Sequence, residues 1–74
     1  MPPNRAPKFL HRRLAKAVNA RRSKLGISQE ELATRSGLHR TYIGGIERAE
    51  RNISLSTLEM IAKGLDVEPS ELLK

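Results

Sequence analysis

The chain has 74 residues, with 14 lysines and arginines against 8 acidic residues and a formal net charge of +6. It contains no cysteine, which excludes disulfide staples and thiolate metal sites, and no apolar run approaches the roughly 20 residues of a membrane-spanning helix. A chain of this length buries only about 60% of its unfolded surface, so one small domain is expected. The cationic excess favours a polyanionic partner, although a solvated basic face explains the charge equally well at this point.

The N-terminal stretch MPPNRAPKFL holds three prolines and no periodic pattern. We therefore expect residues 1–7 to form a flexible basic arm and residues 8–74 to form the folded domain. A first helix is predicted over about 8–25, ended by Gly26. Its apolar positions recur at helical spacing, at Leu10, Leu14, Ala17, Val18 and Leu25.

Two short helices are predicted next. The segment SQEELATRSG offers Ser28 as an N-cap, Glu31 as its capping-box partner and Gly37 as a left-handed exit, which predicts a helix over about 29–36. After the turn, a third helix should start near His39 or Arg40 and run to about Arg48. Two such helices joined by a glycine-containing turn are typical of a helix-turn-helix unit, although any small helical bundle contains similar hairpins.

The C-terminal third predicts two more helices. The segment SLSTLEMIAKGL predicts a fourth helix over about 56–63, with Ser56 as cap and Gly64 as terminator. Its expected apolar stripe comprises Leu55, Leu58, Ile61, Ala62 and Leu65. EPSELL predicts a short fifth helix with Pro69 in its first turn. No segment alternates with period two, so the expected fold class is all-α with five helices.

The third predicted helix has two unlike faces. At 100° per residue, Ile43 and Ile46 fall on one arc and Arg40, Gly44 and Arg48 fall on the other. Tyr42 and Glu47 join the first arc, and Thr41 and Gly45 join the second. The second arc is short, polar and cationic, which suits the major groove of B-DNA.

This arrangement gives roles to particular residues. Arg40 is expected to contact guanine, and Thr41 a thymine methyl or a phosphate. The remaining expected contacts are with the DNA backbone, at Ser28, Gln29, His39, Arg48 and Arg51. His39 has no ligand partner at suitable spacing for a metal site. We expect no metal, no cofactor and no enzymatic activity, because no catalytic arrangement stands out.

The adjacent glycines of the third helix are costly, because each loses roughly 1 kcal/mol against alanine in a helix interior. Since both fall on the outward arc, where no packing requirement explains them, the hypothesis is clearance. Without side chains at Gly44 and Gly45, the helix can lie deep in a groove.

The runs LGISQEELATRSGLHRTYI and IERAERNISLSTLEMIAKGLDVEPSELL resemble the phage-repressor-like (Xre or Cro/C1-type) helix-turn-helix family, and most closely the controller proteins of restriction–modification systems. The resemblance implies a sequence-specific transcriptional regulator that binds a palindromic double-stranded operator as a homodimer through its last two helices. It also implies that Tyr42 lies at the DNA backbone and that Arg22 and Glu47 form a structural ion pair. RNA polymerase is a further candidate partner, and the expected location is the cytoplasm, at the nucleoid.

Two alternatives stay open. The C-terminal apolar residues Met60, Leu65, Val67, Leu72 and Leu73 are the expected dimer interface, but they could instead belong to the core. The chain could also be an antitoxin or a helix-turn-helix adaptor that binds other proteins. Co-purification with a stoichiometric partner would favour that second function.

Overall fold

The computed structural model describes residues 9–74, and the expected arm over residues 1–7 lies outside them. The described elements are α1 (Phe9–Leu25), α2 (Gln29–Ser36), α3 (Arg40–Glu47), α4 (Leu55–Leu65) and the 3-10 helix η2 (Pro69–Leu73). No strand occurs among these residues, so the predicted all-α class is confirmed. The first three helices have nearly the predicted bounds.

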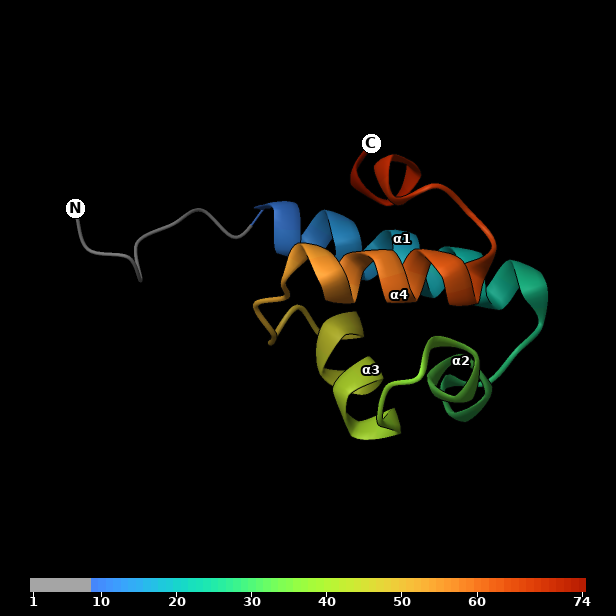
Figure 1. The fold of residues 1–74 in the computed structure, drawn as a ribbon. Helices are drawn as coiled ribbons and strands as arrows, with labels where there is room; N and C mark the ends of the chain where they lie inside the picture. Colours follow the sequence, from blue (N-terminus) through green and yellow to red (C-terminus); the bar gives the residue numbers. More distant parts are fainter. Residues whose placement is uncertain (1–8) are drawn as a thin grey trace.

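The helices form two sides around one core. Figure 1 shows α1 and α4 side by side, with α2 and α3 below them and η2 on the opposite side. In agreement with this view, α2 contacts α4, α3 contacts α1 and α2, and η2 contacts both α1 and α4. The C-terminal element therefore covers the long helices on the side away from α2 and α3.

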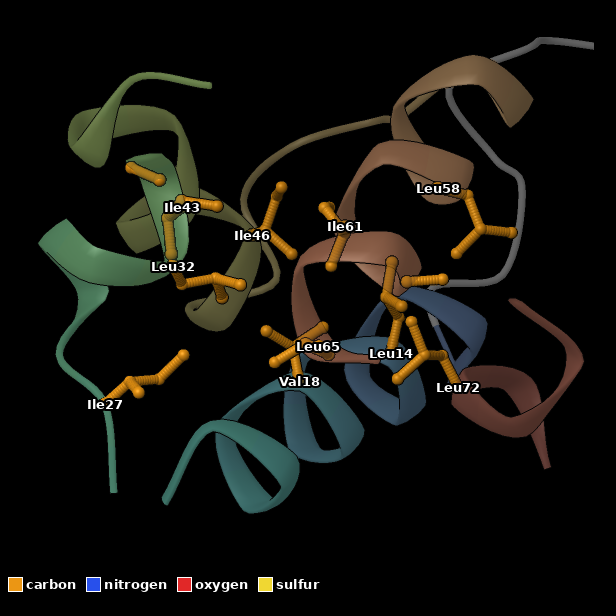
Figure 2. Packing of buried hydrophobic residues seen from close by; sticks show 12 residues of the cluster. Leu14, Val18, Ile27, Leu32, Ile43, Ile46, Leu58, Ile61, Leu65 and Leu72 are labelled. Atoms are coloured by element: carbon orange, nitrogen blue, oxygen red, sulfur yellow. The ribbon is translucent and has the colours of Figure 1, made fainter. Parts of the chain in front are cut away.

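Every element contributes to the core (Figure 2). Because apolar residues recur at helical spacing, each helix turns one stripe inward. Val18, Leu32, Ile43, Ile61 and Leu65 are fully buried. Their side chains meet at the junction of α1, α2, α3 and α4, so the position of α3 is fixed by its apolar stripe.

The predicted bounds of the fourth helix are wrong at both ends. Its N-cap is Ser54, whose Oγ accepts a 3.1 Å hydrogen bond from the Thr57 amide, so Ser56 is already inside α4. At the other end, Asp66 adopts the left-handed conformation (φ 58°), and Gly64 lies inside the helix. Gly64 is therefore not the terminator. It lies where α4 approaches α2, and a Cβ there would overlap Ser36 Oγ.

The predicted fifth α-helix is a 3-10 helix, so the described residues contain four α-helices and not five. The element has only five residues and begins with Pro69, which cannot donate a backbone hydrogen bond. Its Glu71 amide donates to the Glu68 carbonyl at 3.0 Å, the three-residue spacing of a 3-10 turn. Leu72 anchors the element in the core.

The apolar side chains of the C-terminal third are distributed differently from the prediction. Leu65 and Leu72 are 0% and 2% exposed within one chain, so they have no surface left for a dimer partner. Leu55, expected in the buried stripe, is 80% exposed because it is the first residue of α4 and points away from the core. Met60 and Leu73 remain partly exposed, and Val67 is half-buried.

Candidate nucleic-acid interface

The helix-turn-helix unit is formed by α2, a short turn and α3. Ser28 caps α2, because its Oγ accepts a 3.0 Å hydrogen bond from the Glu31 amide. Gly37 then takes the left-handed conformation (φ 75°), and the Leu38 amide donates back to the Ala33 carbonyl at 3.0 Å. His39 occupies the N-cap of α3 without a side-chain capping bond. The cap at Ser28 and the left-handed Gly37 therefore form the turn that the sequence predicts.

The C-terminal end of α3 is tied to α1 by the carboxylate of Glu47. Arg22 Nε donates to Glu47 Oε2 at 2.7 Å and Nη2 donates to Oε1 at 3.0 Å, a bidentate ion pair that confirms the predicted Arg22–Glu47 contact. Asn19 Nδ2 and Gln29 Nε2 also donate to Glu47 Oε1, at 2.9 and 3.2 Å. Side chains from α1 and α2 therefore converge on one carboxylate of α3, which fixes the orientation of α3.

This network changes the acidity of both partners. Burial alone would raise the pKa of Glu47, but the hydrogen bonds from Arg22, Asn19 and Gln29, together with the charge of Arg22, outweigh it and hold that pKa below its ordinary value. The hydrogen bond to Glu47 raises the pKa of Arg22, against the opposing effect of burial. Both groups are therefore ionised at neutral pH.

The outward side of α3 carries the predicted base-contacting residues. Arg40 and Thr41, in its first turn, are exposed. Neither of the two salt bridges found among residues 9–74 involves Arg40. The opposite side of the helix holds Ile43 and Ile46, which are buried as predicted. The helix thus presents short polar and cationic groups to solvent while its apolar stripe secures it.

The glycines of α3 do not lie on a bare surface, which corrects the premise of the clearance hypothesis. Both Gly44 and Gly45 are buried. A Cβ at Gly44 would lie 3.0 Å from Arg48 Nη1, and a Cβ at Gly45 would lie 2.8 Å from Arg51 Cγ. The side of α3 that carries the two glycines is therefore covered by the side chains of Arg48 and Arg51.

These two arginines have different partners. Arg48 Nε donates to Glu50 Oε1 at 3.0 Å, in a pair whose side chains are 60% and 59% exposed. The Arg51 guanidinium carbon lies 5.2 Å from the centre of the Tyr42 ring, a cation–π distance. Tyr42 itself is half-buried and packs against the core. Arg51 thus joins Tyr42 to the Gly45 side of α3, whereas Arg48 lies against Gly44.

The two residues predicted to bind phosphate at the start of α2 are engaged within the chain. Ser28 Oγ accepts the capping hydrogen bond, and the Gln29 amide donates to Glu47. The first backbone amides of α2 remain suited to an anion, because they have no acceptor inside the helix. A phosphate contact by the Gln29 side chain would have to use the second Nε2 hydrogen, because the first is donated to Glu47.

Sequence reasoning missed two features of this face. Glu50, the single acid among the arginines after α3, pairs with Arg48, and its position two residues away in the sequence was the available signal. Ala49 has a positive φ of 60°, which residue type alone would not indicate because glycine and asparagine favour that conformation. Together they shape the segment that follows α3.

Residues 9–74 contain neither a membrane-spanning helix nor a cluster of metal-ligating side chains. No helix in this range is long and apolar enough to cross a membrane. The same residues contain no group of three or more histidine, cysteine, aspartate or glutamate side chains placed to hold a metal ion.

Comparison with known proteins places this geometry among DNA-binding regulators. A family model described as helix-turn-helix matches residues 18–72. Control protein C.SmaI of Serratia marcescens is 53% identical over 60 residues, which cover 81% of this chain and 71% of the relative. The crystal structure of the restriction-modification controller protein C.AhdI from Aeromonas hydrophila superposes with a TM-score of 0.81 at 44% identity, covering 84% of this chain and 94% of that one.

A further solved structure contains nucleic acid. It is the restriction-modification controller protein C.Esp1396I, crystallised as a tetramer in complex with its natural 35 base-pair operator. It superposes with a TM-score of 0.78 at 40% identity, covering 89% of this chain and 97% of that chain.

Proposed function

We propose, from the premise that the chain belongs to the helix-turn-helix family and within it to the control proteins of restriction–modification systems, that it is a sequence-specific regulator that binds a double-stranded operator. The observation that carries the proposal is α3: its apolar stripe is locked in the core while Arg40 and Thr41 stand exposed in its first turn. An α-helix with such a face fits the B-DNA major groove.

The proposed division of labour follows the geometry. Arg40 reads a guanine edge and Thr41 contacts a neighbouring base or phosphate. Contacts that hold the DNA backbone are assigned to His39, Tyr42, Arg48, Arg51 and the amide end of α2 at Ser28 and Gln29. Because Gln29 is bonded to Glu47, its main-chain amide and not its side chain is the proposed phosphate donor.

We further propose that the operator is palindromic and is read by a homodimer. C.Esp1396I assembles as a tetramer on its operator. A two-fold dimer of this fold would read half-sites about 10 bp apart, centre to centre. A DNA target implies a location at the nucleoid in the cytoplasm, and transcription activation would add RNA polymerase as a partner.

The proposed dimer interface is the exposed apolar surface beside the start of α4. Leu55 is 80% exposed, and Leu10 and Leu73 are 48% and 38% exposed. These three residues line one shallow recess together with the buried Leu14 and Leu58. An exposed apolar patch built from α1, α4 and η2 suits contact with a second copy. Met60 and Val67 do not line this recess, and Val67 lines a separate one with Lys63 and Asp66.

Selection of bound sequences from random duplex DNA tests the regulatory function. The expected result is one palindromic consensus. On that consensus, Arg40→Ala should weaken binding by about 1 to 3 kcal/mol and relax the preference at one base position in each half-site. Lys63→Ala is the matched control, because it removes one exposed charge from α4. An unchanged ratio of specific to non-specific affinity in Arg40→Ala would disprove the base contact.

Sedimentation equilibrium tests the dimer. Leu55→Lys should shift the chain toward monomer, because it places a charge in an apolar interface, whereas Leu55→Met keeps an apolar side chain of similar volume and should leave the dimer intact. Since Leu55 is exposed in the single chain, neither change should unfold it. A Leu55→Lys protein that remains fully dimeric would place the interface elsewhere.

A further inference from the structure

Gly45 leaves a gap on α3 that one particular side chain fills. A Cβ at this position would lie 2.8 Å from Arg51 Cγ, 3.1 Å from Nε and 3.5 Å from Cδ. The first of these distances is shorter than carbon atoms tolerate without displacement. The aliphatic stem of Arg51 can therefore lie directly against the α3 backbone only because residue 45 has no side chain.

The end of α3 is shaped to bring Arg51 back over this gap. Ala49 adopts the left-handed conformation, its amide donates to the Ile46 carbonyl at 3.0 Å, and the Glu50 amide donates to the Gly45 carbonyl at 2.8 Å. These two bonds form a Schellman motif, which reverses the chain at a helix C-terminus. The backbone of the residue before Arg51 is thus bonded to Gly45 itself.

The guanidinium at the other end of the Arg51 side chain has a fixed platform. It lies 5.2 Å from the centre of the Tyr42 ring, and Tyr42 is held by the core from below. A cation above an aromatic face is attracted by the ring quadrupole. Arg51 is therefore restrained at its stem by Gly45 and at its charged end by Tyr42.

We propose that Gly45 is a positioning residue for DNA recognition: it seats Arg51 against Tyr42, so that a cation from outside α3 is delivered already ordered to the face that meets DNA. This inference rests on the proposed function. Its physical basis is pre-organisation, because an arginine ordered before binding loses less conformational entropy when the complex forms. Gly44 does not share the role, since its nearest contact is the far end of the Arg48 side chain, which is paired with Glu50.

This seat for Arg51, formed by Gly45 and Tyr42, differs from simple clearance of α3 in a measurable way. If Gly45 only kept α3 bare for close approach to DNA, an added methyl group would hinder binding whether or not Arg51 were present. If Gly45 acts through Arg51, the methyl group should matter only while Arg51 is there. A double-mutant cycle between the two positions separates these cases.

The seat can first be tested without DNA. Tyr42 is the only tyrosine and the chain has no tryptophan, so the upfield ring-current shift of the Arg51 side-chain protons reports on this contact by NMR. We expect Gly45→Ala to abolish the shift, while Gly44→Ala and the ring-preserving Tyr42→Phe retain it. A shift that persists in Gly45→Ala would overturn the seat.

The cycle then measures affinity for the selected duplex at one salt concentration, with thermal unfolding as a check on folding. A cation–π contact at an exposed site is worth a factor of about two to five, so Gly45→Ala should weaken binding by about that factor in the wild type and not at all in Arg51→Ala. Equal losses in both backgrounds would overturn positioning in favour of clearance. If no duplex is selected, the proposed function fails and the positioning role with it, while the NMR result still decides whether Arg51 is seated.

Discussion

Two buried helix-interior glycines, Gly64 in α4 and Gly45 in α3, make room for different kinds of neighbour. At Gly64 a Cβ would overlap Ser36 Oγ and approach Leu32 Cδ1 to 3.1 Å, and both residues are fixed in the core. At Gly45 the obstructing group is the stem of Arg51, an exposed side chain that an added methyl group can displace toward solvent. Gly64 permits α2 and α4 to approach each other, and Gly45 permits the Arg51 side chain to pack against α3.

This difference indicates which positions should govern the stability of the fold and which should govern the recognition of DNA. Positions that face fixed neighbours should change the free energy of unfolding when they are substituted. Positions that face movable cations should change DNA binding with little effect on folding. Three substitutions test the stability side of this division, and the largest effect is expected where α3 is tied to α1.

Glu47→Gln should destabilise the fold by about 3 kcal/mol, because removing one partner of a buried ion pair leaves Arg22 without its counter-charge. The Glu47 side chain is only 5% exposed and accepts four hydrogen bonds from three residues. Urea unfolding followed by far-UV circular dichroism measures the change. Glu50→Gln, the same substitution in the exposed pair with Arg48, should change stability by less than about 0.5 kcal/mol.

The same variant has a signature in pH. Because the folded-state pKa of Glu47 lies below its ordinary value near 4.5, the ionised carboxylate contributes stability that is fully present above that value and is lost as pH falls through the folded pKa. The stability difference between the wild type and Glu47→Gln should therefore shrink below pH about 4.5. A difference that stays constant into strong acid would show that the network does not act through the charge of Glu47.

Gly64→Ala should cost about 2 kcal/mol and lower the melting temperature by about 10 °C, since overlap with a fixed core outweighs the gain in helix propensity. Ser36→Ala offers a matched relief, because Ser36 Oγ is buried without a hydrogen-bond partner among the described residues. Combining the two changes should recover at least half of the loss. If the double variant is no more stable than Gly64→Ala, the conflict lies with Leu32 instead.

Much of this fold could be predicted from local sequence chemistry. The bounds of α2 follow from Ser28 and Gly37, and the two faces of α3 follow from the spacing of Ile43 and Ile46. The limits of α4 could not be predicted as well, since Ser54 and Ser56 are both acceptable caps and Gly64 is equally suited to end a helix or to sit at a helix contact. For Gly64, the close approach of α2 decides between these possibilities.

The candidate site shows the same limit. The residues Arg40, Thr41, Arg48 and Arg51 could be placed near one face from periodicity and the following loop. What covers Gly44 and Gly45 could not, because it depends on the left-handed conformation of Ala49, which no residue pattern indicates. The dimer prediction likewise included Leu65 and Leu72, whose burial within one chain depends on how the helices pack together.

Ala49→Gly should produce the smallest effect and the most informative sign. Alanine pays about 1 kcal/mol in the left-handed conformation, so glycine should stabilise the fold by up to about that amount and raise the melting temperature by about 5 °C. Ala20→Gly, in an exposed position inside α1, should lose a similar amount because its conformation is ordinary helix. Opposite signs for the same substitution would show that the turn after α3 is held under strain to bring Arg51 over Gly45, whereas a destabilised Ala49→Gly protein would mean that the turn does not depend on the left-handed residue.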